Sequence, residues 1–183
     1  MRLEPTPITG VFEAFSMPRV DERGSFARLF CEIELAQAHA GRRIEQINHS
    51  FTRDVGAIRG MHYQIAPAAE AKWVRCLSGR VFDVVVDLRR GSPTFLRWHA
   101  IELDAARMNA IFIPEGCAHG FQVLACDSHL LYLHTAAFRP ELQRAVRWND
   151  PRLNIEWPLP ATVISDRDRN HPDLEPNFQG LAP

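Results

Sequence analysis

The sequence predicts an all-β protein, an antiparallel sandwich or barrel that forms one domain over residues 1–183. Short apolar runs recur along the chain and are separated by turn residues, as in proteins built from many short strands. The 13 prolines and 10 glycines are spread along the sequence, so they mark turns rather than a linker. A chain of 183 residues with a hydrophobic fraction of 46% is large enough to bury one substantial core.

One helix precedes the strands. Residues 32–40 (EIELAQAHA) are rich in helix-forming residues, and Gly41 follows as a stop signal. No comparable pattern occurs later, so we expect only a few short helices at the periphery of the fold.

Residues 81–88 (VFDVVVDL) form the clearest strand. Side chains alternate along a strand, so the even-numbered residues share an apolar face, while Asp83 and Asp87 lie on the other face. Two interpretations of the aspartates stay open. They mark the solvent face of a half-buried strand, with Asp87 and Arg89 as a surface ion pair of little energetic value. Alternatively, Asp83 lies near the mouth of a ligand-binding barrel.

The remaining elements follow from turn signals and apolar runs. Residues 90–93 are typical of a turn, 96–103 of a strand, 104–108 of a connection, and 110–113 of a strand that ends at Pro114. We expect residues 121–125 and 130–134 to pair across a turn at 126–128. The tail, about residues 148–183, is rich in Pro, Asp and Asn, and we expect it to wrap the barrel as ordered loop.

Composition argues against several kinds of partner. A formal net charge of −1, without a basic run interleaved with aromatic residues, argues against nucleic acid. The apolar stretches are too short to span a bilayer, and the N-terminus has no signal-peptide core, so we expect no membrane and a cytoplasmic location. The cysteines show no metal-binding spacing, and we expect reduced, buried thiols at Cys31, Cys76, Cys117 and Cys126.

The most informative residue for chemistry is His62, ten positions before Lys72. An imidazole can remove a proton beside a carbonyl, and a nearby ammonium can stabilise the charge that develops. Arg23 and Arg59 lie upstream and suit an anionic substrate, because guanidinium groups bind phosphate in bidentate fashion. Tyr132 lies in an apolar run and is a candidate general acid.

Each of these residues has an ordinary alternative role. His62 is compatible with a hydrogen-bonded structural histidine, Lys72 with a surface cation and Tyr132 with a buried structural tyrosine. The sequence lacks GxGxxG, GxxxxGK[ST] and GxSxG motifs, so a bound diphosphate would have to be held by arginines.

A metal site is not favoured. Metal-binding barrels usually offer two histidines one residue apart, and here Gln64 follows His62 at that distance. His62 and His119 with Glu70 or Glu115 remain as an alternative set of two histidines and one carboxylate. We therefore expect no metal and no cofactor.

A series of segments over about residues 12–172 resembles the dTDP-4-dehydrorhamnose 3,5-epimerases. Each segment alone is weak, whereas the set in this order is highly specific. The segments are DERGSF (21–26), QINHS (46–50), IRGMHYQ (58–64), AKWV (71–74), FDVVVDLR (82–89), SPTF (92–95), IPEGCAHGF (113–121), WNDP (148–151) and ISDRD (164–168).

The resemblance implies a jelly-roll, cupin-type β-sandwich barrel that forms a homodimer and works without metal or redox cofactor. It implies that His62 is the catalytic base and that Asp168 is the carboxylate paired with it. It also implies that Lys72 is the cation near the sugar C4 oxygen and that Tyr132 is the proton donor on the opposite face. The substrate-binding positions that it implies are Arg23, Phe26, Gln46, Asn48, Arg59, Lys72, His119, Gln143 and Arg167.

The chain departs from the family pattern without losing the implied base, cation or acid. The family usually has glutamate at Arg28, glutamine at Glu70, tyrosine at Phe138, glutamate at Gln143 and lysine at Arg167.

The expected activity is epimerisation of a nucleotide-diphospho-4-keto-6-deoxyhexose, with dTDP-4-dehydro-6-deoxy-D-glucose inverted at C3 and C5. Three alternatives remain. The first is an epimerase that inverts one centre or uses another nucleotide-linked keto sugar. The second is a metal-dependent cupin enzyme, and the third is a non-catalytic sugar-nucleotide binding module.

Overall fold

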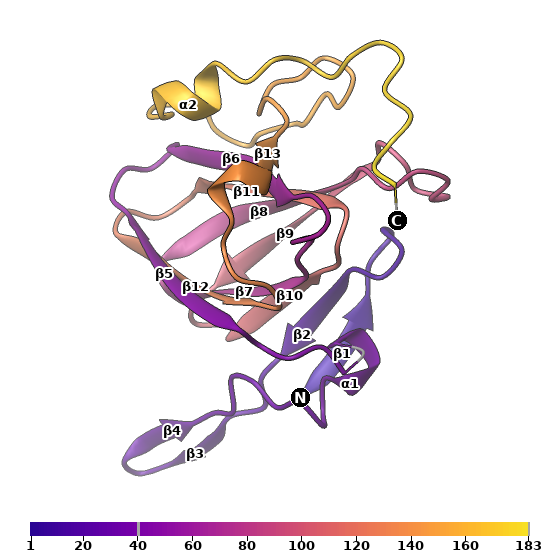
Figure 1. Cartoon of the computed structure of the whole chain (residues 1–183). Coiled ribbons are helices and arrows are strands. Elements are labelled where there is room, and N and C mark those ends of the chain that lie inside the picture. The colour runs from indigo at the N-terminus through magenta and orange to yellow at the C-terminus, as the bar shows by residue number, and fades with distance from the viewer. Residues whose placement is uncertain (40, 183) are drawn as a thin grey trace.

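Two antiparallel sheets face each other in the computed structural model, which describes residues 1–39 and 41–182 (Figure 1). This confirms the predicted antiparallel sandwich. The larger sheet contains, in spatial order, β1 (Arg2–Pro5), β2 (Phe12–Phe15), β10 (Asn109–Ile113), β7 (Lys72–Ser78), β12 (Ser128–His134) and β5 (Gln46–Thr52). The smaller sheet contains β13 (Gln143–Ala145), β6 (Ile58–Gln64), β11 (Cys117–Val123), β8 (Arg80–Asp87) and β9 (Trp98–Asp104).

A separate hairpin, β3 (Arg19–Asp21) and β4 (Gly24–Phe26), extends away from both sheets in Figure 1. The helices are short: α1 (Ala36–His39), the 3-10 helix η1 (Pro140–Leu142) and α2 (Asp166–Arg169). None of the helices within the described part of the chain has the length and apolar character needed to cross a membrane.

Apolar side chains from both sheets fill the interior of the sandwich. Val74 and Leu130 contribute from the larger sheet, and Val85 and Phe121 contribute from the smaller sheet. The alternation of β8 explains this arrangement, because odd-numbered residues of that strand point inward.

On the outward face of β8, Val84 and Val86 are also buried. Val84 and Val86 pack with Leu153 and Ile155 of the C-terminal segment, which runs over the outer face of the smaller sheet (Figure 1). The smaller sheet is therefore covered on both faces.

Asp83 and Asp87 are both fully buried, so the interpretation that they mark a solvent face is wrong. The Asp87–Arg89 ion pair exists, with 2.8 Å between Asp87 Oδ2 and Arg89 Nη2, but it is not a surface pair. Burial by itself raises the pKa of Asp87, whereas hydrogen bonds from Arg89, Ser92 and Thr94 outweigh it and lower the pKa to about 2. Alternation identifies the two sides of a strand but not what covers each side.

Residues 121–125 and 130–134 do not pair with each other, contrary to the prediction. Strand β11 pairs with β6 and β8, and β12 pairs with β5 and β7. The intervening turn crosses from one sheet to the other, so Phe121, Val123 and Leu130 meet in the interior instead.

Two smaller expectations also need correction. The helix is shorter than predicted, since α1 spans Ala36–His39 and the residues before it form a turn. Ala38 and His39 of the helix are buried, whereas Ile33 on the turn is 86% exposed. Residue 40 of the predicted helix lies outside the described residues. Cys76 and Cys117 are buried as expected, but Cys31 is only half-buried and Cys126 is exposed.

Strands β6 and β11 approach closely at two glycines. A Cβ atom added to Gly60 would lie 2.5 Å from the Gly120 Cα, and Gly60 also has a φ of +139°. A side chain at position 60 is therefore excluded by both contact and backbone conformation. This close approach sets the strand pair that carries His62 and His119.

We predict that Gly60→Ala lowers the free energy of unfolding by more than about 3 kcal/mol, because a backbone contact adds to the conformational strain. Gly91→Ala is a matched control, since Gly91 has a φ of +75° and open space around it. It should cost only about 1–2 kcal/mol. Urea unfolding of both variants measures the difference, and equal losses would contradict the close-contact argument.

Candidate active site

A cavity of about 510 Å³ opens between the two sheets, and both sheets contribute to its walls. It brings together most of the residues selected from the sequence. The selected residues that line it are Gln46, Asn48, Arg59, His62, Lys72, His119, Tyr132, Gln143 and Asp168.

His62 on β6 is hydrogen-bonded to Asp168 of α2, with 2.7 Å between Nε2 and Oδ1. The His62 side chain is 29% exposed and the Asp168 side chain only 7%. Since the carboxylate accepts the Nε2–H, the other ring nitrogen of His62 carries the free lone pair. The structure therefore assembles an imidazole and its orienting carboxylate from positions 106 residues apart.

The backbone around α2 holds the Asp168 carboxylate in place. Ser165 caps the helix, and its hydroxyl accepts a hydrogen bond from the Asp168 N–H at 3.1 Å. The Gly60 N–H donates to the second carboxylate oxygen at 3.3 Å. Burial tends to raise the pKa of Asp168, but the hydrogen bonds from His62 and Gly60 lower it below its ordinary value. The carboxylate is thus ionised at neutral pH.

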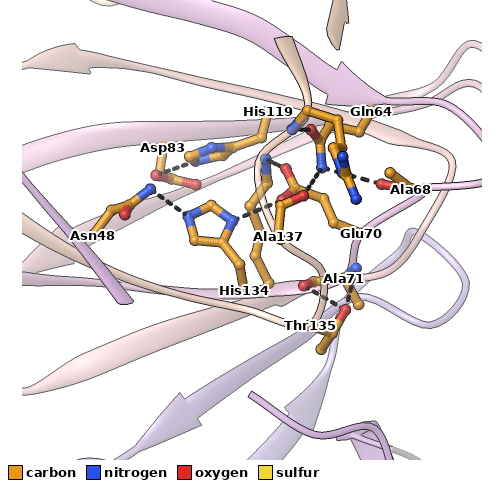
Figure 2. A network of polar contacts seen from close by, with 12 residues as sticks. Asn48, Gln64, Ala68, Glu70, Ala71, Asp83, His119, His134, Thr135 and Ala137 are labelled. Carbon is orange, nitrogen blue, oxygen red and sulfur yellow. Dashed lines mark hydrogen bonds and ion pairs between the residues drawn. The ribbon is translucent and has the colours of Figure 1, made fainter. Parts of the chain in front are cut away.

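His119 on β11 lies beside His62 in the strand register and is paired with Asp83 of β8. Its Nε2 lies 2.8 Å from Asp83 Oδ2, deep between the sheets (Figure 2). Burial lowers the pKa of His119, so its ring is neutral at neutral pH despite the nearby carboxyl group. Of the two interpretations of Asp83, the geometry thus supports a position near the cavity.

Tyr132 on β12 faces the same interior from the larger sheet. Its ring lies edge-on to His119 with 6.2 Å between ring centroids, and its hydroxyl is 3.2 Å from the Ser50 hydroxyl. Burial raises the pKa of the Tyr132 phenol, so the group keeps its proton at neutral pH. A protonated phenol thus lies on the opposite wall from the imidazole pair.

Lys72 at the start of β7 is buried and paired with Glu70, at 3.0 Å between Nζ and Oε1. The second Glu70 oxygen accepts a hydrogen bond from His134 Nδ1 at 2.8 Å (Figure 2). Burial alone raises the pKa of Glu70, but Lys72 and His134 lower it to about 2. The carboxylate therefore joins the ammonium to the end of β12.

This network continues to two residues selected from the sequence. Asn48 Nδ2 donates to His134 Nε2 at 3.3 Å, so His134 is the neutral tautomer with its proton on Nδ1. Gln46 Nε2 donates to Asn48 Oδ1 at 3.0 Å, which fixes the amide along the cavity wall. Figure 2 shows the part of this hydrogen-bond network that contains Asn48, His134 and Glu70.

His134 and Ser50 were not selected from the sequence. Strand alternation could have indicated both residues. Ser50 lies two residues after Asn48 on β5, and His134 lies two residues after Tyr132 on β12, so each shares a strand face with a selected residue. His171 was also missed; its Nε2 lies 3.8 Å from Asp168 Oδ1. Its position three residues after Asp168 could have indicated this contact, because residues three apart around a helical turn lie close together.

Three selected residues lie at the edge of the cavity or support it. Arg59 on β6 donates to Thr52 Oγ1 at 2.9 Å and to the Phe51 carbonyl at 3.1 Å. Arg167 of α2 donates to the Gln143 side chain on β13. These guanidinium groups place positive charge near the imidazole end of the site.

Arg23 and Phe26 lie elsewhere, on the projecting β3–β4 hairpin. Phe26 is 76% exposed, and Arg23 is paired with Asp21 of the same hairpin. Neither residue lines the cavity of the chain that carries it. The nearby Arg28 is also exposed and pairs with Glu34.

The metal-ligand set considered from the sequence does not assemble. Glu70 is held by Lys72 and His134, and Glu115 pairs with Arg42 at 2.8 Å. Among the residues that the structure describes, three potential ligand atoms lie within 4.8 Å of one another in a single group, His62, Asp168 and His171.

Comparison with known proteins identifies the family of the chain. The family model described as dTDP-4-dehydrorhamnose 3,5-epimerase matches residues 5–176. The dTDP-4-dehydrorhamnose 3,5-epimerase of Shigella flexneri is 42% identical over 152 residues, covering 82% of this chain and 83% of the relative. The dTDP-4-dehydrorhamnose 3-epimerase of Streptomyces niveus is 39% identical over 172 residues, covering 93% of this chain and 82% of the relative.

Solved structures show the same fold. The dTDP-6-deoxy-D-glucose-3,5-epimerase of Legionella pneumophila, in complex with dTDP-4-keto-L-rhamnose, superimposes with a TM-score of 0.86 at 34% identity. The match covers 91% of this chain and 89% of that structure. The chain therefore belongs to the dTDP-4-dehydrorhamnose 3,5-epimerase family of cupin-type carbohydrate epimerases.

Proposed function

We propose that the protein inverts C3 and C5 of dTDP-4-dehydro-6-deoxy-D-glucose by proton removal and return. One observation carries the proposal: His62 and Tyr132, on facing sheets, line the same cavity. A base on one face of a sugar ring and an acid on the other are what inversion at carbon requires. The family membership of the chain supports the same reaction class.

The C4 ketone makes this chemistry possible. It acidifies the C–H bonds at C3 and C5, because the carbanion left by either proton delocalises into an enolate. Lys72 is proposed to stabilise the enolate oxygen, since a fixed charge placed where negative charge develops lowers the barrier strongly. This scheme uses the buried Lys72 ammonium and requires neither a metal nor a redox cofactor.

His62 is proposed to remove the proton. Asp168 holds the Nε2–H, so the base is the Nδ1 lone pair, and the imidazolium that forms is stabilised by the same carboxylate. Tyr132 is proposed to protonate the opposite face, since its buried phenol is fully protonated at neutral pH.

The proposed substrate is bound by groups around these three. The keto-sugar complex of the Legionella pneumophila relative supports a dTDP-linked hexose. Gln46, Asn48 and His119 are proposed to bind the sugar end. Arg59, Arg167 and Gln143 are proposed to bind toward the diphosphate, because guanidinium groups match phosphate oxygens.

We further propose that the hairpin of one copy completes the cavity of a second copy in a homodimer. Arg23 and Phe26 match substrate-binding positions, yet they lie outside the cavity of their own chain. Exposed apolar groups favour association: Val20 on the hairpin is 76% exposed and Ile47 on the edge strand β5 is 63% exposed.

A mono-epimerase is the second candidate. Sequence identity does not separate the two candidates, at 39% to the Streptomyces niveus 3-epimerase and 42% to the Shigella flexneri 3,5-epimerase. The mono-epimerase is supported by Phe138, which lines the cavity where the resemblance implies tyrosine. Both candidates share the proposed base, cation and acid and differ in the number of centres inverted.

Incubation of the substrate with enzyme in deuterium oxide tests the reaction. We expect deuterium at both C3 and C5, measured by NMR. Label at C3 alone would favour the mono-epimerase, and no label would contradict both.

His62→Ala should slow exchange at both carbons by about 10²–10⁴-fold, because the proton-transfer group is lost. Binding of thymidine diphosphate to this variant, measured by calorimetry, should remain.

Tyr132→Phe separates the two half-reactions. We expect proton removal to continue while inversion slows by about 10²–10⁴-fold, because the donor is lost but the base remains. NMR of the product in deuterium oxide measures label and configuration together. Tyr63→Phe is the matched control, since Tyr63 is the only other tyrosine and packs under the C-terminal segment. An unchanged ratio of epimers with Tyr132→Phe would count against the assigned role.

Mixed dimers test the proposed contribution of the hairpin. Arg23→Ala and His62→Ala should each be nearly inactive alone. In a mixed dimer, one cavity combines an intact His62 with an intact Arg23 from the other subunit, and the second cavity carries both substitutions. Half of the dimers are mixed after random subunit exchange, so about a quarter of the wild-type activity should return. A lack of recovery, with mixed dimers confirmed by mass spectrometry, would show that Arg23 acts within its own chain or not at all.

A further inference from the structure

We propose that His62, Asp168 and His171 form a binding site for a divalent ion of the zinc type, and that an ion bound there switches off the catalytic base. The second half of this proposal rests on the proposed function, whereas the first half concerns the site alone. The three residues come from β6, from α2 and from the residues that follow α2.

The ligand atoms are already close enough to share one ion. Asp168 Oδ1 lies 2.7 Å from His62 Nε2 and 3.8 Å from His171 Nε2, and all three atoms lie within 4.8 Å of one another. Zinc binds nitrogen and carboxylate oxygen at about 2.0–2.2 Å, which separates neighbouring ligands by roughly 3.3 Å in a tetrahedron. The two distances to the carboxylate bracket that value.

His171 has a buried nitrogen without a partner. Its Nε2 is shielded from solvent, has no hydrogen bond and lies 3.8 Å from Oδ1 of the carboxylate that His62 uses. A buried polar atom left unpaired costs free energy, and an ion between the two rings would provide its missing partner. The position therefore has a physical reason to bind a ligand.

The donor set suits a borderline transition metal. Two imidazoles and one carboxylate are common ligands for zinc and cobalt, whereas magnesium and calcium prefer oxygen alone. Three protein ligands leave one coordination position for water. The 29% exposure of the His62 side chain provides access from the cavity.

The surroundings of the carboxylate limit its movement. Gly60 N–H holds the second oxygen of Asp168, and the Ser165 hydroxyl caps the helix that carries it. Such outer contacts orient metal ligands and strengthen binding. Binding of an ion would then require the two rings to adjust around a fixed carboxylate.

The effect on catalysis follows from the tautomer of His62. A neutral imidazole has one N–H; in the free site it lies on Nε2, where Asp168 accepts it. An ion on Nε2 moves that proton to Nδ1, and none is lost. The Nδ1 lone pair that is proposed to remove the substrate proton is then occupied. The ion should therefore lower kcat, while the nucleotide end of the cavity stays free.

Spectroscopy tests the site without any assay of activity. Cobalt(II) added to the metal-free full-length protein should give visible d–d bands of one tetrahedral or five-coordinate ion, and calorimetry with zinc should give one site. Loss of an outer-shell partner costs about 10–100-fold in affinity, so His171→Ala should lose at least about 100-fold. Thermal unfolding confirms that this variant is folded, and His171→Asn repeats the test with a side chain of closer size.

His129→Ala is the matched control. His49 and His129 place two ring nitrogens 2.9 Å apart on β5 and β12, which makes them the competing histidine pair for zinc. The variant should keep the zinc affinity of the wild type. Absence of the cobalt bands, or equal zinc affinity of His171→Ala and the wild type, would overturn the proposed site.

Kinetics then test the switch. Zinc should lower the kcat for deuterium exchange in the wild type and leave thymidine diphosphate affinity unchanged, with full recovery after chelation. His171→Ala should remain active at zinc concentrations that inhibit the wild type. Inhibition of both proteins to the same extent would overturn the switch. If the wild type binds zinc through His171 but exchanges no proton of the keto sugar, the proposed function fails and the metal site stands.

Discussion

A buried polar or charged group is tolerated only when it is hydrogen-bonded or paired, and the interior of this sandwich is organised around that constraint. His62 pairs with Asp168, His119 with Asp83, and Lys72 with Glu70. The first two pairs join segments that are distant along the chain, and Glu70 also accepts a hydrogen bond from His134, which joins the start of β7 to β12. The cavity walls are therefore held by the same contacts that orient the proposed catalytic groups, so loosening the site would leave buried polar groups without partners.

The C-terminal segment illustrates this coupling. It covers the outer face of the smaller sheet with apolar side chains such as Leu153 and Ile155, and it also delivers Asp168 to β6. Covering the sheet and orienting the imidazole are thus done by one piece of chain. Loss of packing in this layer would move the carboxylate as well, because α2 contacts the strand that carries His62.

Glu70 shows how a buried carboxylate is accommodated. It adds a buried negative charge beside Lys72, and that charge needs more than one donor. His134 provides the second donor, and its ring stacks on Tyr132 with 5.9 Å between centroids. The result is a continuous polar network from the Lys72 ammonium to Asn48, part of which Figure 2 shows.

The sequence alone determined the all-β class, the alternation of β8 and half of the residues that line the cavity, because strand period and ordered motifs are local properties of the chain. Tertiary structure decided what covers each strand face, which is why Asp83 and Asp87 are buried rather than exposed. It also decided that β11 and β12 lie in different sheets, that Arg23 and Phe26 lie outside the cavity of their own chain, and that the His171 ring lies near the His62 ring. These facts depend on contacts between distant segments, and no local pattern encodes which segments meet.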